Sequence, residues 1–275
     1  MIEVLTEMLS YAFLSRAIIV GLLAALCASL LGVSLVLKHY SMIGDGLSHV
    51  GFGALAVASV TGIAPLAFSL PAVLIAAFLL LRINSNSKIN GDSAIALIST
   101  GALAVGVFVI SVSEGTNTDI HSYLFGSILA LSEGEATASI ALSIVTLALY
   151  MLFYNRIFLI TFDETFARAS DGRAGAYNTL IAALTAVVIV LGIRIMGSML
   201  ISGLFIFPPL TSMRLFRTFK SVTLCSAVVS GVCFIAGITV SFLYATPTGA
   251  SVIIANVLAF ALFSVAGAIR SRVKA

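Results

Sequence analysis

Residues 12–37 read AFLSRAIIVGLLAALCASLLGVSLVL, an apolar run whose only charged side chain is Arg16. A helix needs about 20 mostly apolar residues to cross the hydrocarbon core of a bilayer, and this run is longer than that. Its apolar residues are continuous, whereas a strand of a membrane barrel alternates apolar and polar residues. The run therefore predicts a transmembrane helix.

Eight further apolar runs follow, at 43–60, 64–82, 93–112, 136–154, 178–195, 197–213, 221–243 and 249–268. Of the 275 residues, 60% are hydrophobic and 9% are charged, and the mean hydropathy is +1.18. A soluble domain has about 25% charged residues. We therefore predict an all-α fold, a polytopic transmembrane helical bundle of about eight to nine spans. We expect residues 1–275 to form a single transmembrane domain, with no room for a soluble catalytic domain.

Lysine and arginine set the expected orientation, because they are enriched in cytoplasmic connections. They mark alternate connections, at Lys38, Arg82 with Lys88, Arg156 with Arg168 and Arg173, Arg214 with Arg217 and Lys220, and Arg270 with Arg272 and Lys274. The intervening connections 61–63, 113–135 and 244–248 contain neither residue. The pattern predicts a cytoplasmic C-terminus. Arg16 and Arg194 lie at the opposite ends and are exceptions, so the side of the N-terminus stays open.

One carboxylate falls inside a predicted span. Ten of the eleven acidic residues lie at helix ends or in connections, and Asp45 is the exception. It belongs to the segment SMIGDGLSHVGFG, residues 41–53, in which His49 follows four residues later. This spacing places both side chains on one helix face. An intramembrane carboxylate is costly unless it faces water, a partner or an ion.

Carboxylate and imidazole together suit Mn, Fe or Zn, so Asp45 and His49 are candidate ligands of a transit site. Gly44, Gly46, Gly51 and Gly53 would let a second helix or subunit approach and supply further ligands. Two alternatives stay open: a purely structural Asp–His pair, and an aspartate that caps the helix start.

Other titratable residues give weaker signals. His39 directly follows Lys38 and is expected at the membrane surface, whereas Asp119 and His121 could capture an ion at an outer mouth or serve structure. Cys27, Cys225 and Cys233 lie singly in apolar runs, without the spacing of a metal site or a disulfide framework, and are expected to be packing residues.

The longest polar connection on the predicted cytoplasmic side lies between Tyr154 and Asn178. Thr161 and Glu164 have the spacing of a capping box, which predicts a helix start. A short helix would run along the membrane surface and end near Gly172. It is either an ordinary connection or a docking element for a cytoplasmic partner.

Several motifs are absent from the sequence. No Gly-Lys dipeptide occurs, so the chain has no P-loop, and neither HExxH nor GxSxG is present. Basic residues are too few and scattered for nucleic acid. The chain is therefore expected not to be an enzyme, to hold no permanent cofactor, and to draw energy from a partner or an ion gradient.

Four segments resemble the permease subunits of bacterial zinc and manganese ABC importers, the ABC-3 family. They are SMIGDGLSHVGFG (41–53), YLFGSIL (123–129), MGSMLISGLFIFPPLTSM (196–213) and ATPTGASVI (245–253). FDETFARASDG, residues 162–172, is similar to the family's ATPase-coupling segment. These stretches extend over nearly the whole chain in the family's order.

The resemblance implies a type II-like importer permease in the bacterial inner membrane, surrounded by lipid. Its partners would be a second permease copy, two cytoplasmic ATP-binding cassette subunits that hydrolyse ATP, and an extracytoplasmic solute-binding protein. Asp45 and His49 match the family's Asp-x-x-x-His in the translocation path. A coupling segment at about 160–176 would act through Phe162, Asp163, Glu164, Phe166, Ala167, Ala169 and Gly172. Many relatives have an acidic residue where Ser127 stands, so Ser127 receives no metal role.

Three rival hypotheses remain. The chain could be a partner-independent metal carrier or channel, or an ABC permease for a metal chelate or other small cargo. An intramembrane enzyme using Ser48 and His49 would need a third catalytic group, which the sequence does not reveal. Zinc, manganese and iron all accept the proposed ligands, so the metal stays open. Pro208 and Pro209 are expected to break or kink their helix.

Overall fold

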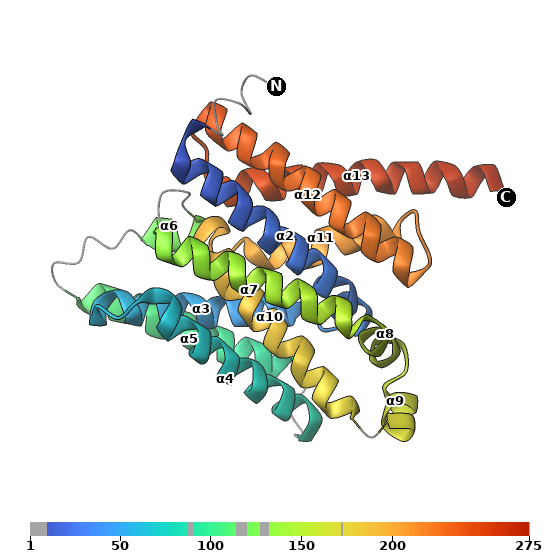
Figure 1. The fold of residues 1–275 in the computed structure, drawn as a ribbon, viewed down its shortest axis with the longest axis horizontal. Coiled ribbons are helices and arrows are strands. Elements are labelled where there is room, and N and C mark those ends of the chain that lie inside the picture. Colours follow the sequence, from blue (N-terminus) through green and yellow to red (C-terminus); the bar gives the residue numbers. More distant parts are fainter. Residues whose placement is uncertain (1–9, 87–90, 114–119, 127–131, 172, 275) are drawn as a thin grey trace.

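The computed structural model describes residues 10–86, 91–113, 120–126, 132–171 and 173–274, and this part of the chain is helical without strands (Figure 1). The helices are α2 (Ala12–Leu37), α3 (Met42–Thr61), α4 (Pro65–Asn86), α5 (Gly91–Val112), α6 (Ile120–Phe125), α7 (Glu133–Leu152), α8 (Tyr154–Phe162), α9 (Glu164–Asp171), α10 (Ala174–Met196), α11 (Ile201–Met213), α12 (Phe219–Tyr244) and α13 (Thr248–Lys274).

Eight of the described helices are long and apolar enough to cross a membrane: α2, α3, α4, α5, α7, α10, α12 and α13. The ninth predicted run, 197–213, forms the 13-residue helix α11. At about 1.5 Å per residue, α11 rises only about 20 Å and is too short to span alone. The prediction of an all-helical bundle with eight to nine spans is confirmed.

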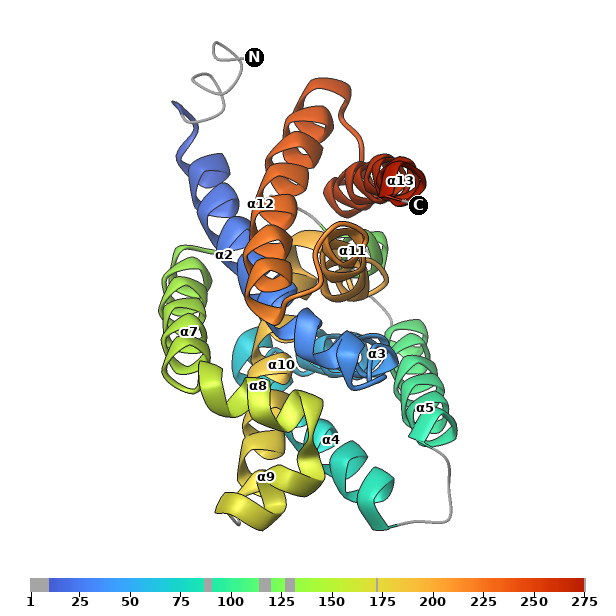
Figure 2. The ribbon, with the colours of Figure 1, turned by 90° about the vertical axis from the view of Figure 1, so that its right-hand side faces the viewer.

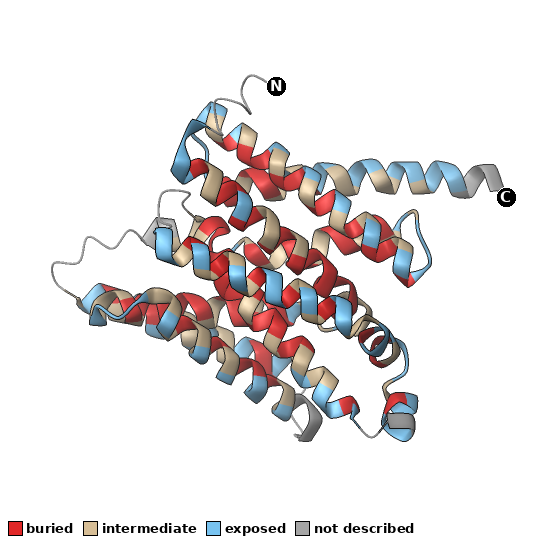
Figure 3. Cartoon of the chain, in the orientation of Figure 1, coloured by how far each residue is buried: buried red, intermediate tan, exposed pale blue. Residues whose placement is uncertain are grey.

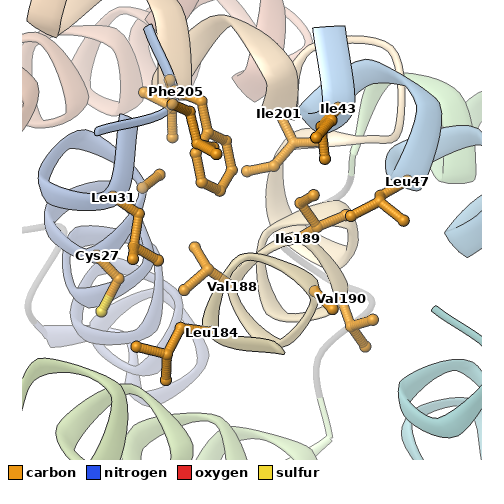
Figure 4. Packing of buried hydrophobic residues seen from close by; sticks show 14 of the residues in the cluster. Cys27, Leu31, Ile43, Leu47, Leu184, Val188, Ile189, Val190, Ile201 and Phe205 are labelled. Carbon is orange, nitrogen blue, oxygen red and sulfur yellow. The ribbon is translucent and has the colours of Figure 1, made fainter. Parts of the chain in front are cut away.

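The centre of the bundle is formed by α2, α10 and α3, whose side chains are mostly buried (Figure 3). Helices α5 and α13 lie at the periphery in both ribbon views and expose most of their apolar side chains (Figure 2). In the core, Cys27 and Leu31 of α2 lie near Val188 of α10 and Phe205 of α11 (Figure 4). Cys27, Cys225 and Cys233 are free thiols, and the first and last are buried.

Ion pairs occur at both ends of the bundle. Helices α8 and α9 lie at one end and α6 at the other (Figure 1). Lys38, at the end of α2, contacts Glu164 of α9, so both residues belong to the predicted cytoplasmic end. The two exceptions to the basic pattern are ion-paired instead: Arg16 binds Glu133, and Arg194 binds Glu135 at 3.2 Å. Acidic partners therefore neutralise the arginines that the orientation rule could not place.

Helix α11 continues through Pro208 and Pro209, so the expected break does not occur. Pro209 lacks the amide that would bond to the Phe205 carbonyl four residues earlier. That carbonyl instead faces Gly32 of α2 so closely that a Cβ atom at Gly32 would overlap it. Close packing of α2 against α11 therefore depends on the absence of a side chain at Gly32.

Candidate functional site: a carboxylate–imidazole pair on α3

Asp45 and His49 lie one turn apart on α3 and face each other. His49 Nε2 is 3.7 Å from Asp45 Oδ2, within ion-pair distance. The His49 side chain is 13% exposed and the Asp45 side chain 36% exposed, so the pair lies at the edge of the protomer's core. His49 Nδ1 is buried and has no hydrogen-bond partner among the described residues. Both side chains therefore keep unused capacity for a ligand.

The second contact to the carboxylate comes from α11. Ser202 Oγ donates to Asp45 Oδ1 at 3.4 Å, which joins two helices far apart in the sequence. Asp45 is the fourth residue of α3, after the N-cap residue Ser41. Its carboxylate contacts two side chains, His49 and Ser202, and these contacts do not favour the helix-cap alternative. Ser48 is buried and donates to the Asp45 backbone carbonyl at 2.7 Å.

The glycines around the pair allow close helix packing within one protomer. A Cβ atom at Gly46 would meet Ile95 of α5, and one at Gly53 would meet the Ala102 carbonyl of α5. A Cβ atom at Gly51 would meet Ile193 of α10. The expected close approach therefore occurs between α3 and its neighbours, and it fixes the position of the helix that carries Asp45.

Within the described residues, no group of three or more His, Cys, Asp or Glu side chains could hold a metal ion. Asp119 lies outside the described residues. His121 belongs to α6, and only its backbone is described. An outer-mouth role for these two residues stays a prediction.

The sequence did not reveal how α6 is held. The Ser198 and Met199 amides donate to the Tyr123 and Leu124 carbonyls at 3.0 and 3.2 Å. The Tyr123 hydroxyl is 2.7 Å from Ser59 Oγ on α3. The Tyr-Leu-Phe-Gly motif drew attention to this segment, but the residues that bind it lie far away along the chain. Helix α6 is thus joined directly to the helix that carries the candidate ligands.

At the other end, the predicted capping box at Thr161 and Glu164 is wrong. Thr161 lies in α8 and donates to the Ile157 carbonyl at 2.6 Å. Helix α9 begins at Glu164, and Asp163 caps it by accepting from the Phe166 amide at 2.8 Å. Because α8 extends further than expected, the cap moves two residues along, and the Glu164 side chain is used for ion pairs instead.

The residues of the predicted coupling segment divide between two faces. Phe162, Phe166 and Ala169 are exposed, whereas Ala167 is buried in the main hydrophobic core. Gly172 lies outside the described residues. The exposed phenylalanines are therefore the side chains available to a partner, and Ala167 seats the helix on the bundle.

Glu164 is the charged centre of this region. It accepts from Lys38 at 3.1 Å and from Arg168 at 2.6 Å. Burial raises the pKa of Glu164, but the hydrogen bonds from Arg168 and Lys38 outweigh it and hold this pKa below its ordinary value. Burial lowers the pKa of the Lys38 ammonium, against the opposing effect of Glu164.

The fold and this site define a class: a polytopic, all-helical membrane protein with a carboxylate–imidazole pair at the edge of its core. Residues 10–267 match the model of the ABC 3 transport family. The chain belongs to the ABC-3 transport family.

Named relatives and a solved structure agree with this membership. The chain is 29% identical to the manganese transport system membrane protein MntC of Halalkalibacterium halodurans, over 93% of this chain and 88% of the relative. It is 27% identical to the manganese import system permease protein ScaB of Streptococcus gordonii, over 91% and 90%. The fold is similar to PsaBC from Streptococcus pneumoniae, solved in complex with Fab, with a TM-score of 0.85 and 25% identity over 96% of this chain and 95% of that one.

Proposed function

We propose that this chain is the membrane-spanning permease subunit of an ABC importer for divalent transition-metal ions. Family membership over residues 10–267 supports the transport class. The Asp45–His49 pair is the observation that carries the metal-ion assignment, because its oxygen and nitrogen ligands suit Mn, Fe or Zn. The relatives named for manganese transport make Mn²⁺ the first ion to test.

Asp45 and His49 act as transient ligands in the translocation path. Two ligands bind an ion more weakly than the four to six of a storage site, which permits release. The partial exposure of Asp45 leaves room for water or for the same pair from a second protomer to complete the coordination. A permease homodimer with the path at its centre fits this incomplete ligand set.

The remaining partners supply energy and cargo. ATP-binding cassette subunits hydrolyse ATP and dock on the segment 160–176 at the cytoplasmic end, where Phe162 and Phe166 are exposed. An extracytoplasmic solute-binding protein delivers the ion to the outer connections 113–135 and 244–248. The permease spans the bacterial inner membrane with its C-terminus in the cytoplasm, performs no covalent chemistry and holds no permanent cofactor.

The metal site is tested by uptake of radioactive manganese into proteoliposomes that contain the permease, its ATPase and its binding protein. Asp45→Asn and His49→Ala should each lower uptake about tenfold to a hundredfold, as expected for loss of one charge-bearing or strongly bound ligand. Ser48→Ala is the matched control, because its hydroxyl contacts only the Asp45 backbone among the contacts described. Near-normal uptake by both ligand variants would refute the site.

Two further outcomes of the uptake experiment distinguish the proposed function from the rival hypotheses. Uptake without ATP by the permease alone would indicate a gradient-driven carrier or channel. Absence of metal uptake by the complete wild-type complex would instead favour a different cargo or an intramembrane enzyme that uses Ser48 and His49.

ATPase docking is tested at α9. Phe166→Ala should weaken co-purification of the ATPase about tenfold, because a buried aromatic anchor at an interface contributes about 1–3 kcal/mol. Phe216→Ala, on the connection between α11 and α12, removes another exposed phenylalanine as a control. Equal losses in both variants would mean that docking is not centred on α9.

A further inference from the structure

Lys38 is an unusually enclosed cation at the predicted cytoplasmic end. It is the C-cap residue of α2, and its side chain is only 8% exposed. Its Nζ atom donates to Asn178 Oδ1 at 2.6 Å and to Glu164 Oε2 at 3.1 Å. Lysine is rarely buried unless it is paired, because taking its charge out of water is costly. A basic residue at a helix end is usually solvated, so the burial of the Lys38 side chain needs a physical reason.

The two acceptors belong to different elements. Glu164 is the first residue of α9, and Asn178 lies near the start of α10. Lys38 therefore joins the end of α2 to both ends of the connection that contains the coupling segment. The other ion pair of Glu164, with Arg168, is internal to α9 and does not reach the rest of the bundle.

The chain that follows Lys38 is a tight turn. The His39 amide donates to the Val36 carbonyl at 3.1 Å, and the Tyr40 amide donates to the Leu35 carbonyl at 2.8 Å. His39 has a φ of 58°, in the left-handed region. Together these features form a Schellman motif at the end of α2. The Ile43 amide then donates to the Tyr40 carbonyl at 3.0 Å as α3 begins.

This turn leaves little slack between Lys38 and the candidate metal ligands. Hydrogen bonds fix the backbone from the end of α2 into the first turn of α3, which contains Asp45. The connection between Lys38 and the start of α3 is therefore a hydrogen-bonded turn and not an extended loop. Charge-assisted hydrogen bonds are roughly twice as strong as neutral ones, so the Lys38–Glu164 contact holds α9 firmly to this turn.

We propose that Lys38 is the positioning residue through which α9 moves the α2–α3 turn, and with it Asp45 and His49. The proposal rests on the proposed function, in which a cytoplasmic ATPase acts on α9. When the ATPase displaces α9, Glu164 draws Lys38 with it, and the start of α3 follows. Lys38 does not touch the transported ion.

The experiment measures manganese uptake and ATP hydrolysis in the same reconstituted complex of permease, ATPase and binding protein. Lys38→Met removes the charge and keeps the length of the side chain. It should leave ATPase assembly and hydrolysis in place and lower the ions transported per ATP about tenfold, within the usual range of coupling between sites. Lys38→Arg keeps the charge and should retain most of the wild-type number of ions transported per ATP.

Lys220→Met is the matched control. It makes the same substitution at an exposed lysine of α12, outside the segment 160–176, and should leave the number of ions transported per ATP unchanged. Glu164→Gln should reproduce the defect of Lys38→Met. The double exchange Lys38→Glu with Glu164→Lys should recover part of the ratio, because an ion pair can form again in the same place.

Several outcomes overturn the proposal. Wild-type transport per ATP in both Lys38→Met and Glu164→Gln would exclude the connection, and an equal loss in Lys220→Met would assign the effect to the loss of any positive charge at this end. If Lys38→Met fails to assemble, Glu164→Gln and the double exchange decide the question. Failure of the wild-type complex to transport manganese, zinc or iron(II) with ATP would instead refute the proposed function, so the two failures are distinguishable.

Discussion

Asp45 is held by contacts that are long for hydrogen bonds. A carboxylate normally accepts at about 2.6–3.0 Å, whereas Ser202 is 3.4 Å away and His49 is 3.7 Å away. Asp45 lies in the first turn of α3, so the cost of about 3 kcal/mol that insertion scales give for a charge at a helix centre is an upper bound here. Its two long contacts leave the carboxylate able to accept a stronger partner. A dication is such a partner, in keeping with the proposed transport site.

A substitution at Ser202 tests how much α11 contributes to manganese binding at Asp45. Ser202→Ala should raise the manganese concentration for half-maximal uptake about twofold to threefold, because a long neutral hydrogen bond contributes at the low end of about 0.5–1.5 kcal/mol. Ser212→Ala, on the same helix but bonded to the Pro208 carbonyl, should leave that concentration unchanged. If Ser202→Ala lowered manganese uptake as much as Asp45→Asn does, Ser202 would itself be a metal ligand as important as Asp45.

At the scale of the elements, α3 is positioned by its contact with α5. Gly53 faces the Ala102 carbonyl, and the backbone of Gly53 in turn lies against Gly106. Two helices that approach this closely gain dispersion contacts and have no space for a side chain. The position of the ligand-bearing helix therefore depends on the absence of a methyl group at Gly53.

A pair of alanine substitutions isolates this contact. Gly53→Ala should lower the free energy of unfolding by about 1–3 kcal/mol, because the added methyl group overlaps backbone and forces the helices apart. Gly101→Ala, on α5, meets no atom within 4 Å and should be neutral or slightly stabilising, since alanine favours helix over glycine. Thermal unfolding in detergent measures both. A Gly53→Ala protein as stable as the parent would show that α3 and α5 can separate freely.

At the scale of the whole molecule, ion pairs occur at both ends of the bundle. Lys38 pairs with Glu164 at the end with α8 and α9, and Arg16 and Arg194 pair with glutamates at the other end. The connection 214–220, whose Leu215 carbonyl accepts from Arg270, contains three basic residues and no acidic one. Because paired arginines carry little net charge, they oppose this signal less than isolated ones, which supports the proposed cytoplasmic C-terminus.

Reporter fusions test the orientation. Green fluorescent protein fused to the C-terminus should be fluorescent, and alkaline phosphatase at the same position should be inactive. Alkaline phosphatase fused after Gly62, in the connection between α3 and α4, should be active, because that connection is predicted to be external. The opposite pattern at both sites would invert the topology.

The helices and their class were predictable from the sequence, because an apolar run of membrane-spanning length is a local property of the chain. The i, i+4 spacing that places Asp45 and His49 on one face is local too. The capping prediction failed within the same local range. Thr161 and Asp163 can both cap a helix, and the choice depends on where α8 ends on the bundle.

The partners of these residues required the folded chain. Ser202 and Asp45 are 157 residues apart, and Lys38 and Glu164 are 126 residues apart. Neither pair has a spacing that a sequence pattern could reveal. Ala167 is buried and Phe166 exposed because of the surface on which α9 rests, although both fit the same short helix. Composition and spacing predicted two candidate ligands on a membrane helix, and helix packing selected the side chains that contact them and link them to the ends of the protein.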